Sequence, residues 1–512
     1  MSIKRPENAD FLLAAQDHGY DLSDSQMQAY LNLADKSLNS YEAIDALYAA
    51  YVAQPTPLRE HSRPLPAENL HAAWYVKTHI TGAAEGPLKG RTVVIKDNVS
   101  VAGVPMANGS LSLEGYVPSE DATVVKRLLA AGATVVGKSV CEDLCFSGAS
   151  FTSASGAVKN PWDMTRNAGG SSSGSAVLVS LGEVDMAIGG DQGGSIRMPS
   201  AWSGIVGHKP TYSLVPYTGA FPIERTIDHV GPMANTVRDC ALMLDVIAGA
   251  DGLDSRQKNP PAVHCLATLD QGVAGLKIGL LREGFAIPGM SEPQVDALVK
   301  AAVAQLESLG AIVGEASAPW HSGVALDMWN VIATDGAAYQ MLQGNGYGMN
   351  VDGYYDPEIM RYYGAKRREH ANSLSHSVRA VALTGHYSLK NLHGASYAKA
   401  RMLVPELTRQ YDEAFKSFDV LVMPTMPFVA TPLTAPDAPI EEYVHSALNM
   451  LANTAPFDIT GHPATSIPAG LADGLPVAMM IVAPRFKDAL ALRVAQAYEQ
   501  VRGEFPKPPR SS

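Results

Sequence analysis

The stretch GGSSSGSAVLVSLGEVDMAIGGDQGGSIRMPS, residues 169–200, decides the fold. It opens with a glycine- and serine-rich turn that enters a run of small and apolar residues, which indicates a buried helix. The strand VDMAIGG and a second glycine-rich turn follow. Since Ser171 and Ser195 stand 24 residues apart, a helical crossover can return both turns to one edge of a sheet. The glycines beside each serine let the backbone approach a substrate closely.

Short runs of β-branched and other apolar residues recur on both sides of this stretch, as expected for strands buried in a sheet. These runs are RTVVIKD (91–97), ATVVGK (133–138), LKIGLLRE (276–283), FDVLVMPT (418–425) and PVAMMIVAP (476–484). Helical patterns such as DATVVKRLLAAG (121–132) lie between them. This alternation predicts an α/β fold with a mixed central sheet flanked by helices.

The same patterns divide the chain into four segments. Residues 1–86 are predicted to form an N-terminal helical domain, and residues 87–319 the first part of a catalytic core. Residues 320–416 carry mostly helical signals and are predicted to be a small cap, and residues 417–512 return to the core. The N-terminal helices contain no candidate chemistry. They either pack onto the main body or join two copies in a homodimer.

Composition restricts the class of protein. The chain has 512 residues, of which 46% are apolar, and a net charge of −12, which argues against binding to nucleic acids or acidic membranes. No secretory signal and no apolar run long enough for a membrane span is found in the sequence. Four cysteines are too few for a disulfide framework, so reduced thiols and a cytoplasmic location are expected: Cys141, Cys145, Cys240 and Cys265.

Three motifs point to chemistry that their context does not support. GATVVGKS (132–139) matches a phosphate-binding loop, but its central residues favour an extended strand. GSSSG, centred on Ser172, matches a nucleophile elbow but lacks the hydrophobic strand that must precede one. Cys141 and Cys145 have no second ligand pair near by, so we interpret them as two buried thiols and expect no metal and no cofactor.

Lys96 ends the buried strand VVIK, upstream of the two serine turns. By itself such a lysine usually extends to solvent, and each serine turn by itself is an ordinary strand-to-helix connection. Together the three features favour a catalytic site. A lysine buried by apolar neighbours becomes a base because burial lowers its pKa. Asp97 follows directly, but strand alternation directs it to the opposite face.

The strings GGSSSGSA, GGDQGGSIRMPS and IKDN resemble the amidase signature family. GHKPTYSLVP, HVGPM, DVLVMPT and PFDITGHPATSIPAG extend this resemblance from about residue 88 to beyond residue 480. The helical extension and the string AWYVKT additionally resemble the enantioselective amidases associated with nitrile degradation. The resemblance implies an amidase that converts carboxamides to carboxylic acids and ammonia.

The resemblance assigns the roles of the family's residues to the matching positions of this chain. The resemblance implies that Ser195 is the nucleophile, that Ser171 is a bridging serine after a cis peptide, and that Lys96 is the base. The implied oxyanion hole consists of backbone N–H groups at Gln192, Gly193, Gly194 and Ser195. Ser173 departs from the pattern, because the family more often has glycine at this position.

Other residues are predicted to support the site. Ser172 either hydrogen-bonds the lysine or caps the next helix, and Asp191 and Arg197 brace the nucleophile turn. The residues expected to line an apolar pocket for small aliphatic or aromatic amides are Phe146, Ile227, Trp329 and Met450. A role in the core is an open alternative for each of these four.

Four other functions compete with this interpretation. A serine–histidine hydrolase would use Ser195 with His208, His229 or His462. An amidotransferase component would release ammonia from glutamine for a partner enzyme. Anilides, hydrazides or esters are alternative substrates on the same fold, and a non-catalytic scaffold would keep the fold without the chemistry.

Overall fold

The computed structural model describes residues 3–349 and 352–509, in two compact units that meet between Thr56 and Pro57. The first unit contains helices α1 (Asn8–His18) and α2 (Asp24–Tyr51). Ser23 begins α2 by accepting a hydrogen bond from the backbone of Gln26, a capping box that satisfies a free N–H group. No residue of α2 is buried, so its apolar side chains lack a core within this unit.

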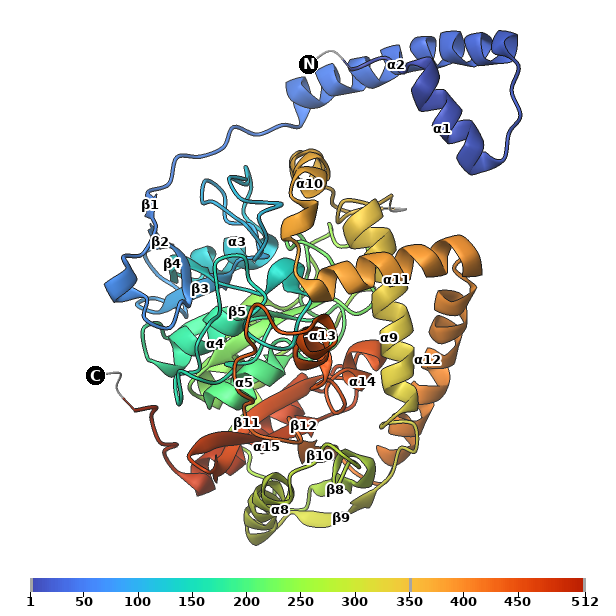
Figure 1. The fold of residues 1–512 in the computed structure, drawn as a ribbon. Coiled ribbons are helices and arrows are strands. Elements are labelled where there is room, and N and C mark those ends of the chain that lie inside the picture. Colours follow the sequence, from blue (N-terminus) through green and yellow to red (C-terminus); the bar gives the residue numbers. More distant parts are fainter. Residues whose placement is uncertain (1–2, 350–351, 510–512) are drawn as a thin grey trace. The chain divides into compact units, whose positions relative to one another are not determined.

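The second unit is built on one mixed sheet (Figure 1), for which twelve strands are found in the described residues. Their order is β1-β2-β4-β3-β5-β7-β6-β11-β12-β10-β8-β9. The strands are β1 (His61–Ser62), β2 (Trp74–Thr81), β3 (Thr92–Lys96), β4 (Thr134–Ser139), β5 (Met186–Asp191), β6 (Val206–Lys209), β7 (His229–Ala234), β8 (Lys277–Leu281), β9 (Ile312–Ala316), β10 (Val420–Pro424), β11 (Ala464–Ala472) and β12 (Leu475–Val482). The predicted mixed α/β fold is confirmed.

Helices flank this sheet (Figure 1). They are α3 (Thr123–Ala130), α4 (Ser173–Ser180), α5 (Arg197–Ser203), α6 (Val237–Ile247), α7 (Cys265–Thr268), α8 (Pro293–Ser308), α9 (Val324–Ala337), α10 (Pro357–Glu369), α11 (His376–Leu392), α12 (Ala395–Ala414), α13 (Ile440–Leu448), α14 (Pro456–Thr460) and α15 (Asp488–Arg502). The described residues between 320 and 416 form α9 to α12 and contain no strand, in keeping with a helical region there. None of the described helices has the length and apolarity needed to cross a bilayer.

Strand pairing positions the candidate site. β3 pairs in parallel with both β4 and β5, so the carboxyl ends of these strands reach the same edge of the sheet. Lys96 is the last residue of β3, and Asp191 is the last residue of β5. The turn after β5, which carries Ser195, therefore begins beside the lysine. α4 connects the turn at Ser171 back to β5, which is the crossover that the sequence predicts.

The helical prediction for residues 1–86 is wrong for the part after Thr56. Strands β1 and β2 lie there, and β2 pairs antiparallel with β4 in the central sheet. The residues of β2 alternate between buried and more exposed positions only at its end, and its first residues are all buried. The eight residues of β2 mix polar and apolar side chains and follow a proline-rich arm, so the sequence there has no clear strand pattern. The other boundaries, at residues 87, 320 and 417, stay predictions.

The segment that matches a phosphate-binding loop is a strand, as its β-branched residues predict. Thr134–Ser139 forms β4, and the lysine of the motif, Lys138, is fully buried. Its Nζ atom lies 3.0 Å from Asp97 Oδ1. Asp97 also accepts hydrogen bonds from the backbone N–H groups of Ala107 and Asn108. The carboxylate next to Lys96 is thereby committed to a different lysine.

Candidate functional site

Lys96 and Ser171 meet at the carboxyl end of β3. Lys96 Nζ lies 2.8 Å from Ser171 Oγ and 3.3 Å from the carbonyl oxygen of Gly190, and both side chains are fully buried. Among residues 3–349 and 352–509, no carboxylate lies within ion-pair distance of this lysine. Lys96 Nζ donates to both oxygens, and nothing there favours its charged form by direct ion pairing.

The turn around Ser171 is tightly packed. The peptide bond between Gly170 and Ser171 is cis, and a Cβ atom at Gly170 would collide with the carbonyl of Ala149. Ser173, where the family more often has glycine, donates a hydrogen bond of 2.8 Å to Glu142. Burial raises the pKa of this glutamate to about 7. The extra hydroxyl is therefore used within the turn and does not disturb it.

Ser172 links the two serine turns by hydrogen bonds. It makes neither of the contacts predicted for it, to the lysine or as a helix cap. Its hydroxyl donates to the carbonyl of Gly190 at 3.1 Å and accepts from the N–H of the same residue at 3.2 Å. Its own backbone N–H donates to the carbonyl of Ser195 at 3.2 Å. It contacts neither the lysine nor the first turn of α4 as a cap. The prediction failed because the strand end at Gly190 offers both a donor and an acceptor near by.

The turn from Gln192 to Ser195 has its carbonyl groups tied back by hydrogen bonds. The indole N–H of Trp329 donates to the carbonyl of Gln192 at 2.8 Å. The hydroxyl of Thr454 donates to that of Gly193 at 2.5 Å, and the N–H of Met198 donates to that of Gly194 at 2.7 Å. In a trans peptide the N–H points away from the C=O. These contacts therefore direct three successive N–H groups away from their anchors.

Those three N–H groups, at Gly193, Gly194 and Ser195, donate to no protein acceptor in the described part of the chain. The Ser195 hydroxyl likewise has no partner there, and Ser195 is 5% exposed at the wall of a pocket. A Cβ atom at Gly193 would approach Trp329 to 2.8 Å, and one at Gly194 would collide with Thr454. Glycine is required at both positions because the two anchors pack so closely. Three free donors beside a free hydroxyl can stabilise an oxyanion.

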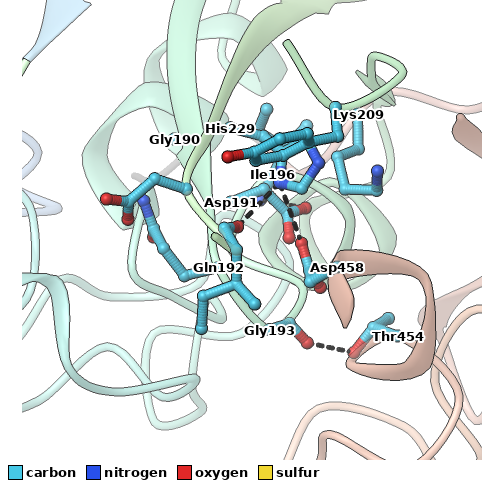
Figure 2. A network of polar contacts seen from close by, with 12 residues as sticks. Gly190, Asp191, Gln192, Gly193, Ile196, Lys209, His229, Thr454 and Asp458 are labelled. Atoms are coloured by element: carbon cyan, nitrogen blue, oxygen red, sulfur yellow. Dashed lines mark hydrogen bonds and ion pairs between the residues drawn. The ribbon is translucent and has the colours of Figure 1, made fainter. Parts of the chain in front are cut away.

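A buried charge cluster of Arg197, Asp191 and Asp458 braces this turn, and Figure 2 labels its two carboxylates. The Arg197 guanidinium binds Asp191 through two nitrogens, at 2.9 and 3.0 Å, and Asp458 at 2.7 Å. Asp191 also accepts a hydrogen bond of 3.0 Å from the N–H of Ile196. Burial and the charge of Asp191 raise the pKa of Asp458, whereas Arg197 outweighs burial and lowers the pKa of Asp191. The brace predicted for Asp191 and Arg197 thus includes a third residue.

An apolar pocket opens beside Ser195. Three of the four predicted pocket residues line it: Phe146, Ile227 and Trp329. Met450 does not line it, because this side chain is buried against Gly148. Leu448 and Leu451 border the pocket in its place. The chain turns directly after α13 ends at Leu448, and helical spacing cannot predict which side chain faces inward beyond that point.

The three candidate histidines are engaged away from Ser195. His208 contacts Thr465 and Asp488, and His462 contacts Thr460 and Asp412. His229 contacts the carbonyl of Ile227 at 2.7 Å, and burial lowers its pKa well below the ordinary value. The described residues form no cluster of three or more His, Cys, Asp or Glu side chains suited to a metal ion.

A hydrolase of the serine type needs an available hydroxyl, a base that can take up its proton and N–H groups that receive the negative charge. The sheet edge beside Lys96 brings together a hydroxyl, an amine and free N–H groups. The model of the family described as Amidase matches residues 42–492. The chain therefore belongs to the amidase family and is an amide hydrolase.

Individual relatives agree with this assignment. The chain is 49% identical to an enantioselective amidase of Rhodococcus rhodochrous, over 100% of this chain and 99% of the relative. It is 37% identical to a component of the glutamyl-tRNA(Gln) amidotransferase of Roseiflexus sp. (strain RS-1), over 91% and 93% of the two chains. Among solved structures, it resembles the native peptide amidase of Stenotrophomonas maltophilia with a TM-score of 0.69 and 29% identity, over 82% of this chain and 85% of that one.

The anchored turn yields a prediction. Trp329→Phe keeps an aromatic ring in the pocket but removes the donor to Gln192, and Thr454→Val removes the donor to Gly193. We expect kcat to fall about tenfold in each, a fraction of the roughly 10²–10³-fold that losing an oxyanion donor costs. KM should change little, because the ground-state carbonyl needs these donors less than the transition state does.

Steady-state kinetics on one amide substrate measures this split. Phe146→Leu is the matched control, since it alters the pocket wall without touching a carbonyl of the turn. It should change KM more than kcat. A rise in KM with unchanged kcat in Trp329→Phe and Thr454→Val would show that the two anchors do not position the turn.

Proposed function

We propose that this amidase hydrolyses carboxamides through a relay of Ser195, Ser171 and Lys96 and an acyl-enzyme intermediate. The contact of 2.8 Å between Lys96 Nζ and Ser171 Oγ carries the proposal, because it is buried and has no competing carboxylate among the described residues. A free lysine is neutral in only about one molecule in 10³ at pH 7. The relay uses the uncharged form of the Lys96 amine, and no carboxylate among the described residues pairs with its charged form.

The first half of the cycle forms the acyl-enzyme. Ser195 Oγ attacks the amide carbon, while its proton passes to Ser171 and the proton of Ser171 passes to the neutral Lys96 amine. The carbonyl oxygen becomes an oxyanion, which the N–H groups of Gly193, Gly194 and Ser195 receive. The tetrahedral intermediate then breaks its C–N bond, and the relay returns a proton to the leaving nitrogen. Ammonia departs and the acyl group stays on Ser195.

Water completes the second half. The relay removes a proton from a water molecule as its oxygen attacks the acyl carbon, and a second oxyanion forms in the same place. Breakage of the bond to Ser195 Oγ releases the carboxylic acid and restores the hydroxyl. The same two proton carriers serve both halves, so the mechanism requires no histidine and no metal.

Substitution of the three residues tests this relay. Lys96→Ala, Ser171→Ala and Ser195→Ala should each lower kcat/KM by about 10⁴-fold or more, as expected when members of one catalytic unit are removed. Ammonia release from a fixed amide measures the loss, and circular dichroism checks that each variant folds. His462→Gln is the control for a serine–histidine pair and should keep most of the activity. Substantial activity in Lys96→Ala would contradict the relay.

The pocket supports small aliphatic or aromatic acyl groups. Its lining is mostly apolar and includes Phe146, Ile227, Trp329, Leu448 and Leu451. None of its described lining residues is charged, whereas the amino and carboxylate groups of glutamine would need charged partners when buried. The relative in Rhodococcus rhodochrous is named an enantioselective amidase. These points favour a stand-alone amidase over an amidotransferase component. They also favour discrimination between enantiomers that differ at the α-carbon of the acyl group.

A substrate panel tests the acyl preference. Propionamide, benzamide and the two enantiomers of 2-phenylpropionamide should release ammonia, and glutamine should be a poor substrate with kcat/KM lower by about 10²-fold or more, as expected for a buried unpaired charge. Esters, anilides and hydrazides of the same acids extend the panel. Glutamine hydrolysis as fast as that of benzamide would contradict the acyl assignment and leave the relay untouched.

We propose further that the protein is a cytoplasmic homodimer joined through α2. Tyr30, Leu33, Tyr41, Ile44 and Tyr51 are exposed on this helix, and at 100° per residue they share one face. An apolar stripe of this length on an otherwise unburied helix fits the same stripe of a second copy. The four buried free cysteines are suited to a reducing compartment.

Removal of residues 1–56 tests the dimer without disturbing the sheet, since β1 and β2 begin after this point. The full chain should have the mass of a dimer in light scattering, and the shortened chain the mass of a monomer that still hydrolyses amides. Leu33→Glu with Ile44→Glu in the full chain should have the same effect. A shortened chain that stays dimeric would contradict this interface.

A further inference from the structure

Two thiols form part of the wall between the acyl pocket and a second cavity. Cys145 lines the pocket together with Ser195 and Phe146. Cys141 borders a separate cavity of about 310 Å³, whose lining includes Ser110 and Ser153. Cys145 is 4% exposed and Cys141 is fully buried, so Cys145 is the thiol that a small molecule in the pocket can contact. The other two cysteines lie elsewhere in the core.

The two sulfur atoms share one acceptor. Cys141 Sγ lies 3.5 Å from Asn108 Oδ1, and Cys145 Sγ lies 3.2 Å from the same oxygen. The distance between the two sulfur atoms is therefore no greater than the sum of these two distances. The chain between them is a tight turn, in which the N–H of Cys145 donates to the carbonyl of Glu142 at 2.8 Å. Two thiols at the ends of one turn and on one acceptor are placed to bond to each other.

Cys145 is also the more reactive of the two. Burial raises its pKa, but hydrogen bonding with Cys141 and, when the Lys96 amine holds a proton, the charge of Lys96 outweigh burial and lower the pKa to about 7. Burial raises the pKa of Cys141 well above its usual value. A thiolate is the form that oxidants attack. Cys145 would therefore react first, and Cys141 would follow.

We propose that Cys145 and Cys141 form an oxidation site in the wall of the acyl pocket, where peroxide converts the two thiols to a disulfide that inactivates the enzyme. The inference rests on the proposed acyl pocket for its effect on the rate of hydrolysis, and the disulfide itself is independent of that proposal.

The chemistry needs only hydrogen peroxide as oxidant. The Cys145 thiolate attacks one peroxide oxygen, an S–O bond forms, the O–O bond breaks, and hydroxide leaves and takes up a proton to become water. The Cys141 sulfur then gives up its proton and attacks the sulfur of the Cys145 sulfenic acid. An S–S bond forms and a second water molecule leaves. The two thiols lose two electrons and two protons, and one peroxide becomes two waters.

A disulfide would change the site through this turn. Its sulfur atoms lie about 2.05 Å apart, so Cys145 must leave Asn108 and the neighbourhood of Lys96. The turn also contains Glu142, whose N–H donates to the carbonyl of Ser171 at 3.2 Å, and it leads into Phe146 of the pocket wall. Movement of roughly 1 Å in catalytic groups costs about 10²-fold in rate. We expect a loss of that size.

The experiment treats the full-length enzyme with hydrogen peroxide. Amidase activity should fall by about 10²-fold and return with dithiothreitol, the fall expected from a misplaced relay. Both cysteines lie in the tryptic peptide Ser139–Lys159, which should be two hydrogens lighter and resist alkylation. In Cys141→Ser the sulfenic acid has no partner, so dimedone should label Cys145. Each variant's activity is compared with that of its own untreated sample.

Controls separate this site from other oxidation. Cys240→Ala with Cys265→Ala should respond to peroxide as the wild type does, and Cys145→Ser should be protected. Inactivation that persists in Cys145→Ser, as oxidation of the pocket residue Met198 would cause, would overturn the proposal. So would full alkylation of both cysteines in the oxidised enzyme. Because the mass measurement needs no activity, a disulfide without loss of activity would overturn only the link to hydrolysis.

Discussion

The whole site depends on keeping one buried lysine away from carboxylates. Lys96 and Lys138 end or lie near the end of two neighbouring parallel strands, and both are fully buried. Asp97 pairs with Lys138 and accepts hydrogen bonds from the N–H groups of Ala107 and Asn108, and among the described residues it forms no ion pair with Lys96. A buried ammonium without a partner is strongly disfavoured. One buried lysine therefore faces a carboxylate at 3.0 Å, and the other is isolated as a candidate base.

The second feature is a turn with three successive free N–H groups, at Gly193, Gly194 and Ser195. A glycine-rich turn has the freedom to adopt this shape but no tendency to keep it. The restraint comes from far along the chain: Trp329 is 137 residues from Gln192, and Thr454 is 261 residues from Gly193. The pocket wall and the N–H donors are therefore linked. The indole of Trp329 borders the pocket and also hydrogen-bonds the carbonyl of Gln192, whose peptide bond carries the N–H of Gly193.

Sequence patterns predict the parts of this design that are local. The buried strands that end at Lys96 and Asp191 are continuous apolar runs, and the crossover between the two serine turns follows from helix-then-strand spacing. Such patterns do not predict contacts that are set by tertiary packing. Ser172 hydrogen-bonds to Gly190 because the two turns lie side by side in the folded chain. β2 is not predicted from the sequence because its residues are partly polar and follow a proline-rich arm. Leu451 lines the pocket and Met450 does not. The chain turns after α13 ends at Leu448, and the sequence does not show which side chain then faces the pocket.

The thiol pair shows why burial alone does not define a core residue. As a sequence pattern, Cys141 and Cys145 are two small apolar side chains one helical turn apart. In the folded protein they close a tight turn instead of lying on a helix, since Leu144 and Cys145 both have positive φ angles. That turn brings the sulfur atoms onto a common acceptor and puts one of them in the pocket with Ser195. Once the amine of Lys96 holds a proton, its charge stabilises a thiolate at Cys145, so the reactivity of this thiol depends on the charge state of the lysine.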